Sequence, residues 1–181
     1  MRRTNLKINV LSNIKDSPDT HTTKWFKDIW AHVISMGLGK MMVDPFARNC
    51  QHCRPHTNDL NPNTDANSHV CALEFLRTFK NDKVDLVVFD PPFSERRCKE
   101  HYEGYGVNLY ASDSKLIDDC LKETSRILRA GGCLLKFGYN MNKPAPGFSL
   151  LSGWIINKNG NANSTLVSLW VNESNSLSKW S

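Results

Sequence analysis

The feature that most constrains the fold is a nearly unbroken apolar run, Val84-Asp85-Leu86-Val87-Val88-Phe89, which ends at Asp90-Pro91-Pro92-Phe93. Runs of this kind are typical of strands buried on both faces, as in parallel sheets covered by helices. The two prolines remove backbone donors and stiffen the chain where the strand ends. Because ligands of such sheets bind beyond the carboxyl ends of the strands, the segment predicts a rigid, carboxylate-bearing loop at a ligand site.

The rest of the chain alternates between helical and strand-like patterns. Apolar residues at helical spacing predict helices over residues 22–36, 70–79 and 114–128, and we expect the Gly131-Gly132 pair to end the third helix. Apolar runs predict strands over residues 5–12, 41–43, 133–137, 150–156 and 165–171, the first of them at an edge. The last two strands are separated by a polar loop that is typical of a hairpin.

Two stretches have the composition of loops. Residues 47–68 are rich in Asn, Asp, Pro and His, and residues 94–112 are charged, aromatic and glycine-containing. We expect the second stretch to be a mobile surface loop, because loops of this length in compact domains usually serve a function. The order of elements predicts an α/β sandwich with a mainly parallel sheet and a closing antiparallel hairpin.

Length, charge and cysteine content limit the organisation. The chain of 181 residues, 40% apolar and 23% charged, predicts a single domain over residues 1–171, with residues 1–40 as a strand and helix packed on it and a flexible tail at 172–181. The net charge of +5 permits a polyanionic partner without requiring one. No apolar run is long enough to span a membrane, and polar residues interrupt any export signal. We therefore expect a cytoplasmic protein with free thiols.

The loop at Asp90 has chemistry that suits a planar amine. The exocyclic amine of a nucleobase is a poor nucleophile, because its lone pair is delocalised into the ring. Oxygen acceptors from Asp90 and the Pro91 carbonyl would hold the two hydrogens of the amine, and Phe93 would stack on an extruded base. Asp44-Pro45 also ends a predicted strand, which would bring a second carboxylate to this edge. The alternative interpretation is a rigid turn whose aspartate caps a helix or bridges the core.

Several segments match one enzyme family in order. They are Val43 to Asn49, Thr57 to Pro62, Ala72 to Leu76, Asp85 to Ser94, Tyr102-Glu103-Gly104 with Gly106, and Gly131 to Asn140. Together they resemble the amino-methylating, S-adenosylmethionine-dependent DNA methyltransferases, and most closely the small phage-type adenine methylases. The resemblance implies a class I methyltransferase-like (Rossmann-like) fold and methyl transfer to the N6 amine of adenine in DNA. For a phage-encoded enzyme it places the protein in the host cytoplasm.

The resemblance also implies a role for each matching position. The catalytic, base-binding loop would consist of Asp90, Pro91, Pro92 and Phe93. The cofactor would be bound by Asp44, Pro45, Phe46, Ala47, Asp59, Leu60, Asn61, Cys71 and Ala72. Among these, the loop at Asp44 would hold the methionine end of S-adenosylmethionine, Asp59 would accept hydrogen bonds from its ribose, and Cys71 occupies a position that reaches its adenine. An Asx turn is the alternative interpretation of Asp59.

The residues after the base-binding loop are candidates for contact with nucleic acid. They are Ser94, Arg96, Arg97, Lys99, Tyr102 and Tyr105. Cations suit phosphate contact and aromatic rings suit base stacking. A solvated charged loop is the alternative interpretation. The chain has no room for a separate target-recognition domain, so sequence specificity would be low or confined to residues 94–112.

The match departs from the family in two places. The glycine-rich first loop of the family is replaced by Phe46-Ala47-Arg48-Asn49-Cys50, so the backbone must approach the cofactor without glycine. Cys71 stands where the family often has an acidic residue that contacts the cofactor adenine.

A metal site and other acceptors are the competing hypotheses. Cys50-Gln51-His52-Cys53 with His56 has zinc-like spacing, and Cys71 or Cys98 would complete four ligands, but a second CxxC pair is missing, so we expect no metal. The same loop chemistry would serve an RNA adenine, cytosine N4 or another planar amine such as a protein amide. A non-catalytic protein that binds the cofactor or nucleic acid is a further hypothesis, and the sequence leaves the oligomeric state open.

Overall fold

The computed structural model describes residues 7–15, 20–92, 95–105, 114–159 and 163–173. The elements in chain order are β1 (Lys7–Ile14), the 3-10 helix η1 (Thr20–Thr22), α1 (Lys24–Ser35), β2 (Met42–Val43), α2 (Ala72–Arg77), β3 (Val84–Phe89), α3 (Glu95–Tyr102), α4 (Ser114–Ile127), β4 (Leu128–Gly138), β5 (Phe148–Lys158) and β6 (Thr165–Asn172).

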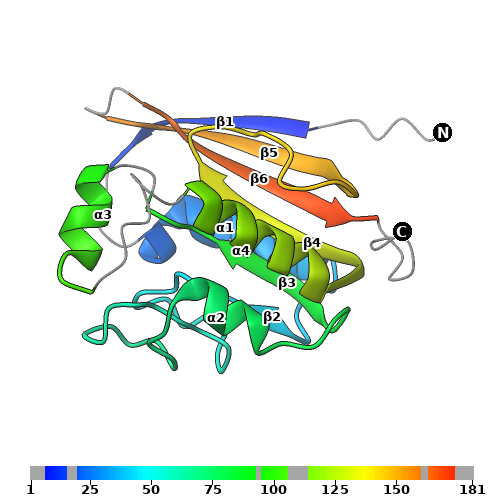
Figure 1. Cartoon of the computed structure of the whole chain (residues 1–181). Coiled ribbons are helices and arrows are strands. Elements are labelled where there is room, and N and C mark those ends of the chain that lie inside the picture. Colours follow the sequence, from blue (N-terminus) through cyan, green and yellow to red (C-terminus); the bar gives the residue numbers. More distant parts are fainter. Residues whose placement is uncertain (1–6, 16–19, 93–94, 106–113, 160–162, 174–181) are drawn as a thin grey trace.

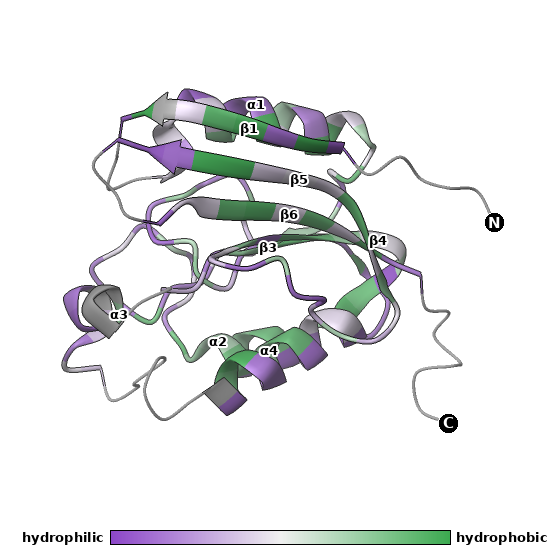
Figure 2. Cartoon of the chain, turned by 90° about the horizontal axis from the view of Figure 1, so that it is seen from above, coloured by the Kyte–Doolittle hydropathy of each residue, from purple (hydrophilic) through white to green (hydrophobic). Residues whose placement is uncertain are grey.

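The strands form one mixed sheet. Their order is β1-β5-β6-β4-β3-β2. Strands β2, β3 and β4 run parallel to one another, β6 runs antiparallel to both β4 and β5, and β1 pairs in parallel with β5 at the edge. Figures 1 and 2 show α1 on one face of the sheet and α2 with α4 on the other. The predicted α/β sandwich, its closing antiparallel hairpin and its first edge strand are confirmed.

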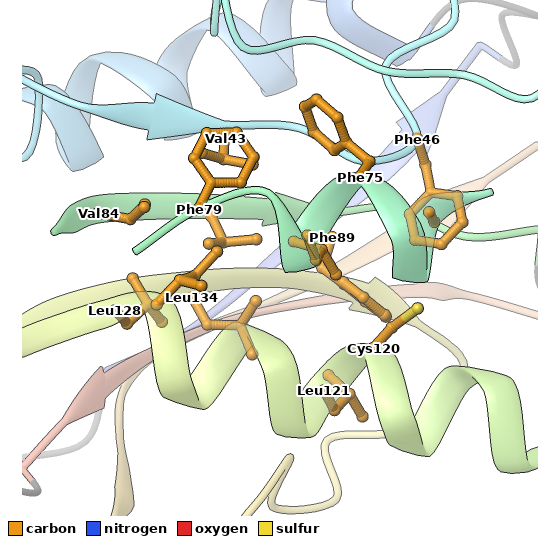
Figure 3. Close-up of a cluster of buried hydrophobic side chains, with 14 of the residues drawn as sticks. Val43, Phe46, Phe75, Phe79, Val84, Phe89, Cys120, Leu121, Leu128 and Leu134 are labelled. Carbon is orange, nitrogen blue, oxygen red and sulfur yellow. The ribbon is translucent and has the colours of Figure 1, made fainter. Parts of the chain in front are cut away.

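Two buried clusters hold the layers together. One lies between the sheet and α2 with α4 and includes Val43, Phe75 and Phe89, several of whose members are drawn in Figure 3. The other lies between the sheet and α1 and includes Phe26, Leu86 and Val88. Every residue of β3 is buried, and from Leu86 to Phe89 its side chains alternate between these clusters. Burying one such leucine or phenylalanine contributes about 1.5–3 kcal/mol.

The stretch predicted to be a loop at residues 94–112 contains a helix, α3, over Glu95–Tyr102. Its sequence, ERRCKEHY, consists largely of good helix formers and has no glycine or proline. Cys98 and Tyr102 lie four residues apart, so they share one helix face, and both are buried. The loop prediction is therefore wrong for these residues. Figure 1 shows α3 apart from both helix layers, at the end of the molecule to which β3 leads.

The glycine pair does not end the preceding helix. Helix α4 ends at Ile127 and β4 begins at Leu128, so Gly131 and Gly132 lie within a strand. A Cβ atom on Gly132 would lie 2.9 Å from the carbonyl oxygen of Val84, a distance that side chains do not tolerate. The glycine is needed for close approach between β3 and β4.

The last strand extends beyond its predicted end. Strand β6 takes in Asn172, which the sequence analysis placed in the polar tail. Asn172 is fully buried, and its side-chain amide donates a hydrogen bond of 2.9 Å to the Leu128 carbonyl. Within the ranges that the structure describes, no helix is long and apolar enough to cross a membrane.

Candidate functional site

Three aspartates converge where the parallel strands β2 and β3 end, an edge that we call the carboxyl edge. Asp44 directly follows β2, and Asp90 directly follows β3. Thr57 forms an isolated parallel bridge with Asp44, which brings Asp59 to the same edge. Asp44 and Asp59 are buried and Asp90 is partly buried. The predicted meeting of Asp44 and Asp90 at one edge agrees with this geometry.

Asp44 is a buried acid held by its own loop. Its Oδ1 accepts a hydrogen bond of 3.0 Å from the Phe46 backbone N–H. Burial raises the pKa of Asp44 well above its usual value, and the negative charges of Asp90 and Asp59 raise it further, while the bond from Phe46 lowers it. An acid of this kind gains most from a cationic ligand, since opposite charges attract strongly in a partly dry site.

We expect Asp44→Asn to stabilise the ligand-free chain at neutral and alkaline pH. The folded-state pKa of Asp44 lies above the ordinary value of 3.8, so the wild type loses stability as pH rises from that value through the folded-state pKa. Asparagine keeps an oxygen for the Phe46 N–H and has no charge to bury. The free energy of unfolding of the variant should therefore exceed that of the wild type at pH 8, by a margin that grows as pH rises above 3.8.

Urea unfolding at pH 4 and pH 8 checks this prediction, with Asp118→Asn as the matched control on the exposed face of α4. The difference between wild type and Asp44→Asn should grow with pH, and the control should show no such growth. A variant that is less stable than the wild type at pH 8 would contradict it.

Asp59 accepts hydrogen bonds from two loops and one helix. Its Oδ1 accepts from the Asn61 N–H at 2.9 Å, which is the Asx turn weighed from the sequence. Its Oδ2 accepts from the Arg48 N–H at 3.2 Å and from the Tyr102 hydroxyl at 3.1 Å. Burial raises the pKa of Asp59, while these three hydrogen bonds lower it. Arg48 has a φ of +49°, a left-handed conformation that glycine usually supplies in such loops.

Asn58 joins the two loops of the site, and the sequence analysis missed it. Its side-chain Nδ2 donates to the carbonyls of Pro45 at 3.2 Å and Val70 at 3.0 Å, and its Oδ1 accepts from the Val70 N–H at 3.1 Å. The side chain is fully buried. The side-chain amide of Asn58 therefore links the loop after β2 to the segment that leads to α2. A buried Asn in a loop of Asn and Asp residues carries no periodic signal that would reveal this role.

The predicted base-binding loop is described in part. Asp90 and Pro92 are partly buried and Pro91 is buried, whereas Phe93 and Ser94 lie outside the described residues. Asp90 lies near enough to Asp44 to raise the pKa of that group. In the neighbouring strand, Lys136 pairs with Phe89, and burial lowers the pKa of this lysine. Its Nζ donates to Asn140 Oδ1 at 3.0 Å.

Several predicted cofactor residues have side chains that belong to the core. Pro45, Ala47 and Ala72 are buried, and Phe46 packs edge-on against Phe89 with ring centroids 5.2 Å apart. Figure 3 shows Phe46 within the cluster next to α2 and α4. Such residues present their backbone rather than their side chains to a ligand. Leu60, Asn61 and Cys71 are partly buried. Cys71 is the N-cap residue of α2, and its side chain makes no capping hydrogen bond.

The residues predicted to contact nucleic acid differ in their exposure to solvent. Lys99 is exposed on α3, and Arg96 and Arg97 belong to the same helix, although their side chains lie outside the description. Tyr102 is 4% exposed and bonded to Asp59. The ring of Tyr102 packs in the core cluster next to α4, so it is buried in this conformation, and its role in base stacking stays a prediction. Tyr105 is partly buried.

The zinc alternative gains no support from the geometry. Within the described ranges, no group of three or more His, Cys, Asp or Glu side chains is arranged to hold a metal ion. All six cysteines are free, as expected. Burial raises the pKa of the Cys50 thiol to about 12, with a further contribution from Asp44, and burial also raises the pKa of Cys53. Both groups are therefore protonated thiols in the metal-free chain.

The fold of the chain is similar to that of solved structures, although its sequence matches no known family. No protein-family model matches the sequence, and no curated protein matches it. Among solved structures, the one described as "Putative methyltransferase yhhF from Escherichia coli" is 13% identical with a TM-score of 0.56, over 91% of this chain and 92% of its own. TrmN of Thermus thermophilus is 15% identical with a TM-score of 0.52, over 78% of this chain and 47% of its own. Together with the sheet order, these likenesses show that the chain has a class I methyltransferase-like fold.

Proposed function

We propose that the protein transfers a methyl group from S-adenosylmethionine to the N6 amine of adenine in DNA. The observation that carries the proposal is the meeting of Asp44, Asp59 and the Asp90-Pro91-Pro92 loop at the carboxyl edge. The methyltransferase-like fold and the DPPF tetrapeptide support it. Ligands of parallel sheets bind at this edge, so the geometry agrees with the site proposed.

The residues present fit S-adenosylmethionine. A buried acid whose pKa is raised by burial and by neighbouring acids, as at Asp44, suits a ligand with a positive sulfonium. We propose that the loop at Asp44 holds the methionine end, that Asp59 accepts hydrogen bonds from the ribose, and that the segment at Cys71 and Ala72 lies along the adenine. When bound, S-adenosylmethionine supplies a methyl group on a good leaving group.

Asp90 would act on the acceptor amine. Its carboxylate and the Pro91 carbonyl would accept hydrogen bonds from the two amine hydrogens, which orients the nitrogen lone pair toward the methyl group. The nitrogen would form a bond to the methyl carbon as the bond between that carbon and sulfur breaks, so that S-adenosylhomocysteine leaves. The methylated nitrogen would then lose one proton to Asp90 or to water. Rate enhancement in such a transfer comes mainly from positioning and from fixed charges around the reacting groups. Phe93 would stack on the base.

The class of acceptor is the part of the proposal that needs a direct test. The net charge of +5 agrees with a polyanionic substrate. RNA adenine, cytosine N4 and other planar amines share the chemistry that Asp90 would serve, and a binding protein without catalysis would share the fold.

Transfer of labelled methyl from S-adenosylmethionine to duplex DNA, single-stranded DNA and RNA tests the proposal, with products digested to nucleosides and identified by mass. We expect N6-methyladenine in DNA. Asp90→Ala protein, prepared in parallel from a host without its own adenine methylase, controls for contamination. Label in RNA alone, in cytosine or in no polymer would contradict the proposed substrate.

A further inference from the structure

Two tyrosines dock the end of α3 onto the loop that contains Asp59. The Tyr102 hydroxyl donates to Asp59 Oδ2 at 3.1 Å. The Tyr105 hydroxyl donates to Asn61 Oδ1 at 3.1 Å and accepts from Asn63 Nδ2 at 3.2 Å. Both acceptors, Asp59 and Asn61, belong to the loop proposed to bind the cofactor ribose. The docked helix and the cofactor would therefore use the same polar groups.

Oδ2 of Asp59 has no acceptor position left for a ligand, whereas Oδ1 has one. A carboxylate oxygen offers about two acceptor positions. Oδ2 already accepts from the Arg48 N–H and the Tyr102 hydroxyl, and Oδ1 accepts from the Asn61 N–H. The two N–H donors are backbone groups fixed in the loops of the site, whereas the Tyr102 hydroxyl comes from a separate helix. If a ribose hydroxyl is to bind Oδ2, the tyrosine is the donor that can leave.

Tyr102 remains a donor over the physiological pH range. Burial raises the pKa of its hydroxyl, and the charge of Asp59 and their hydrogen bond raise it further. The contact therefore does not open by ionisation of the phenol. A competing hydrogen-bond donor is needed to displace it.

We propose that the Tyr102 hydroxyl occupies the ribose position in the ligand-free protein, and that cofactor binding displaces it and releases the end of α3. This inference rests on the proposed function. Helix α3 carries Lys99 and follows the Asp90 loop in the chain, so its release would couple cofactor entry to the segment expected to contact nucleic acid. The cofactor would then bind before the nucleic acid.

Tyr102→Phe isolates the hydroxyl, because phenylalanine keeps the ring in the core cluster. The variant removes a donor that competes for a charged acceptor, so binding of S-adenosylhomocysteine should tighten at least about tenfold in calorimetry. Ser35→Ala is the control, because it removes an exposed hydroxyl at the end of α1 that bonds to the His32 carbonyl and not to the loops of the site. Its affinity should stay within about twofold of the wild type.

Hydrogen exchange of the wild-type chain gives a second measurement that does not depend on a variant. Backbone amides of α3 should exchange faster when S-adenosylhomocysteine is bound than without it. Slower or unchanged exchange, or a Tyr102→Phe protein that binds S-adenosylhomocysteine no more tightly than the wild type, would overturn the inference alone. Failure of the wild type to bind S-adenosylhomocysteine would overturn the proposed function as well.

Discussion

Asp90→Ala is expected to lower the rate of methyl transfer at least about 10²- to 10³-fold, the size of effect seen when one preorganised polar contact to a reacting group is removed. The affinity for S-adenosylmethionine should change by less than about twofold, because the proposed cofactor contacts come from the loops at Asp44 and Asp59. Asp90 follows a strand whose residues are all buried, so a change in its side chain leaves the strand in place. Single-turnover kinetics with adenine-containing DNA and calorimetry with the cofactor separate the two effects.

Two further variants sharpen this test. Asp90→Asn keeps one oxygen acceptor and loses the charge, so its rate should lie between those of the wild type and Asp90→Ala. Asp118→Ala removes an exposed carboxylate of α4 and should leave the rate unchanged. An Asp90→Ala protein with the wild-type rate would remove the mechanistic basis of the proposal.

Asn58→Ala is expected to cost about 3 kcal/mol of unfolding free energy. The change removes the amide that pairs with the Pro45 carbonyl and with the N–H and carbonyl of Val70. A buried polar group left without a partner costs about 1–3 kcal/mol, and part of this cost is relieved when the loops relax. For a chain of this size the loss lowers the melting temperature by about 6–12 °C.

Calorimetry of thermal unfolding measures this change. Asn157→Ala is the control. The Asn157 side chain donates a hydrogen bond to the Ser12 hydroxyl of β1 and accepts one from the Ser164 hydroxyl, which lies between β5 and β6. Asn157 is partly exposed, so water can replace these partners, and the control should change stability by no more than about 1 kcal/mol. If Asn58→Ala unfolds at the wild-type temperature, the amide does not hold the loops together.

The sequence predicted the elements whose signals are local. β3 follows from its nearly unbroken apolar run. α1 follows from Trp25, Phe26, Ile29 and Val33, which are spaced on one helix face and buried as that spacing requires. The aspartates at the carboxyl edge were predictable because both Asp44 and Asp90 directly follow strands. In these cases neighbouring residues alone contain the necessary information.

The elements that depend on distant contacts were harder to predict. Among the described side chains of helix α3, Cys98 and Tyr102 are buried, whereas the largely charged sequence of the helix suggested a loop. Gly132 matched the pattern of a helix C-terminus. In the structure, glycine is needed there because a side chain would collide with the Val84 carbonyl of the adjacent strand. Asn58 and Tyr102 act on loops that meet them only in the folded chain. Periodicity cannot detect such side-chain contacts, because they depend on tertiary structure.

Calorimetric titration with S-adenosylmethionine tests the central claim, that the carboxyl edge is a cofactor site. We expect one molecule to bind per chain in the wild type and in Asp90→Ala, and at least about tenfold weaker binding in Asp59→Ala, whose folding is checked by its thermal transition. A wild-type protein that does not bind S-adenosylmethionine, or an Asp59→Ala protein that binds it as tightly as the wild type, would contradict the claim.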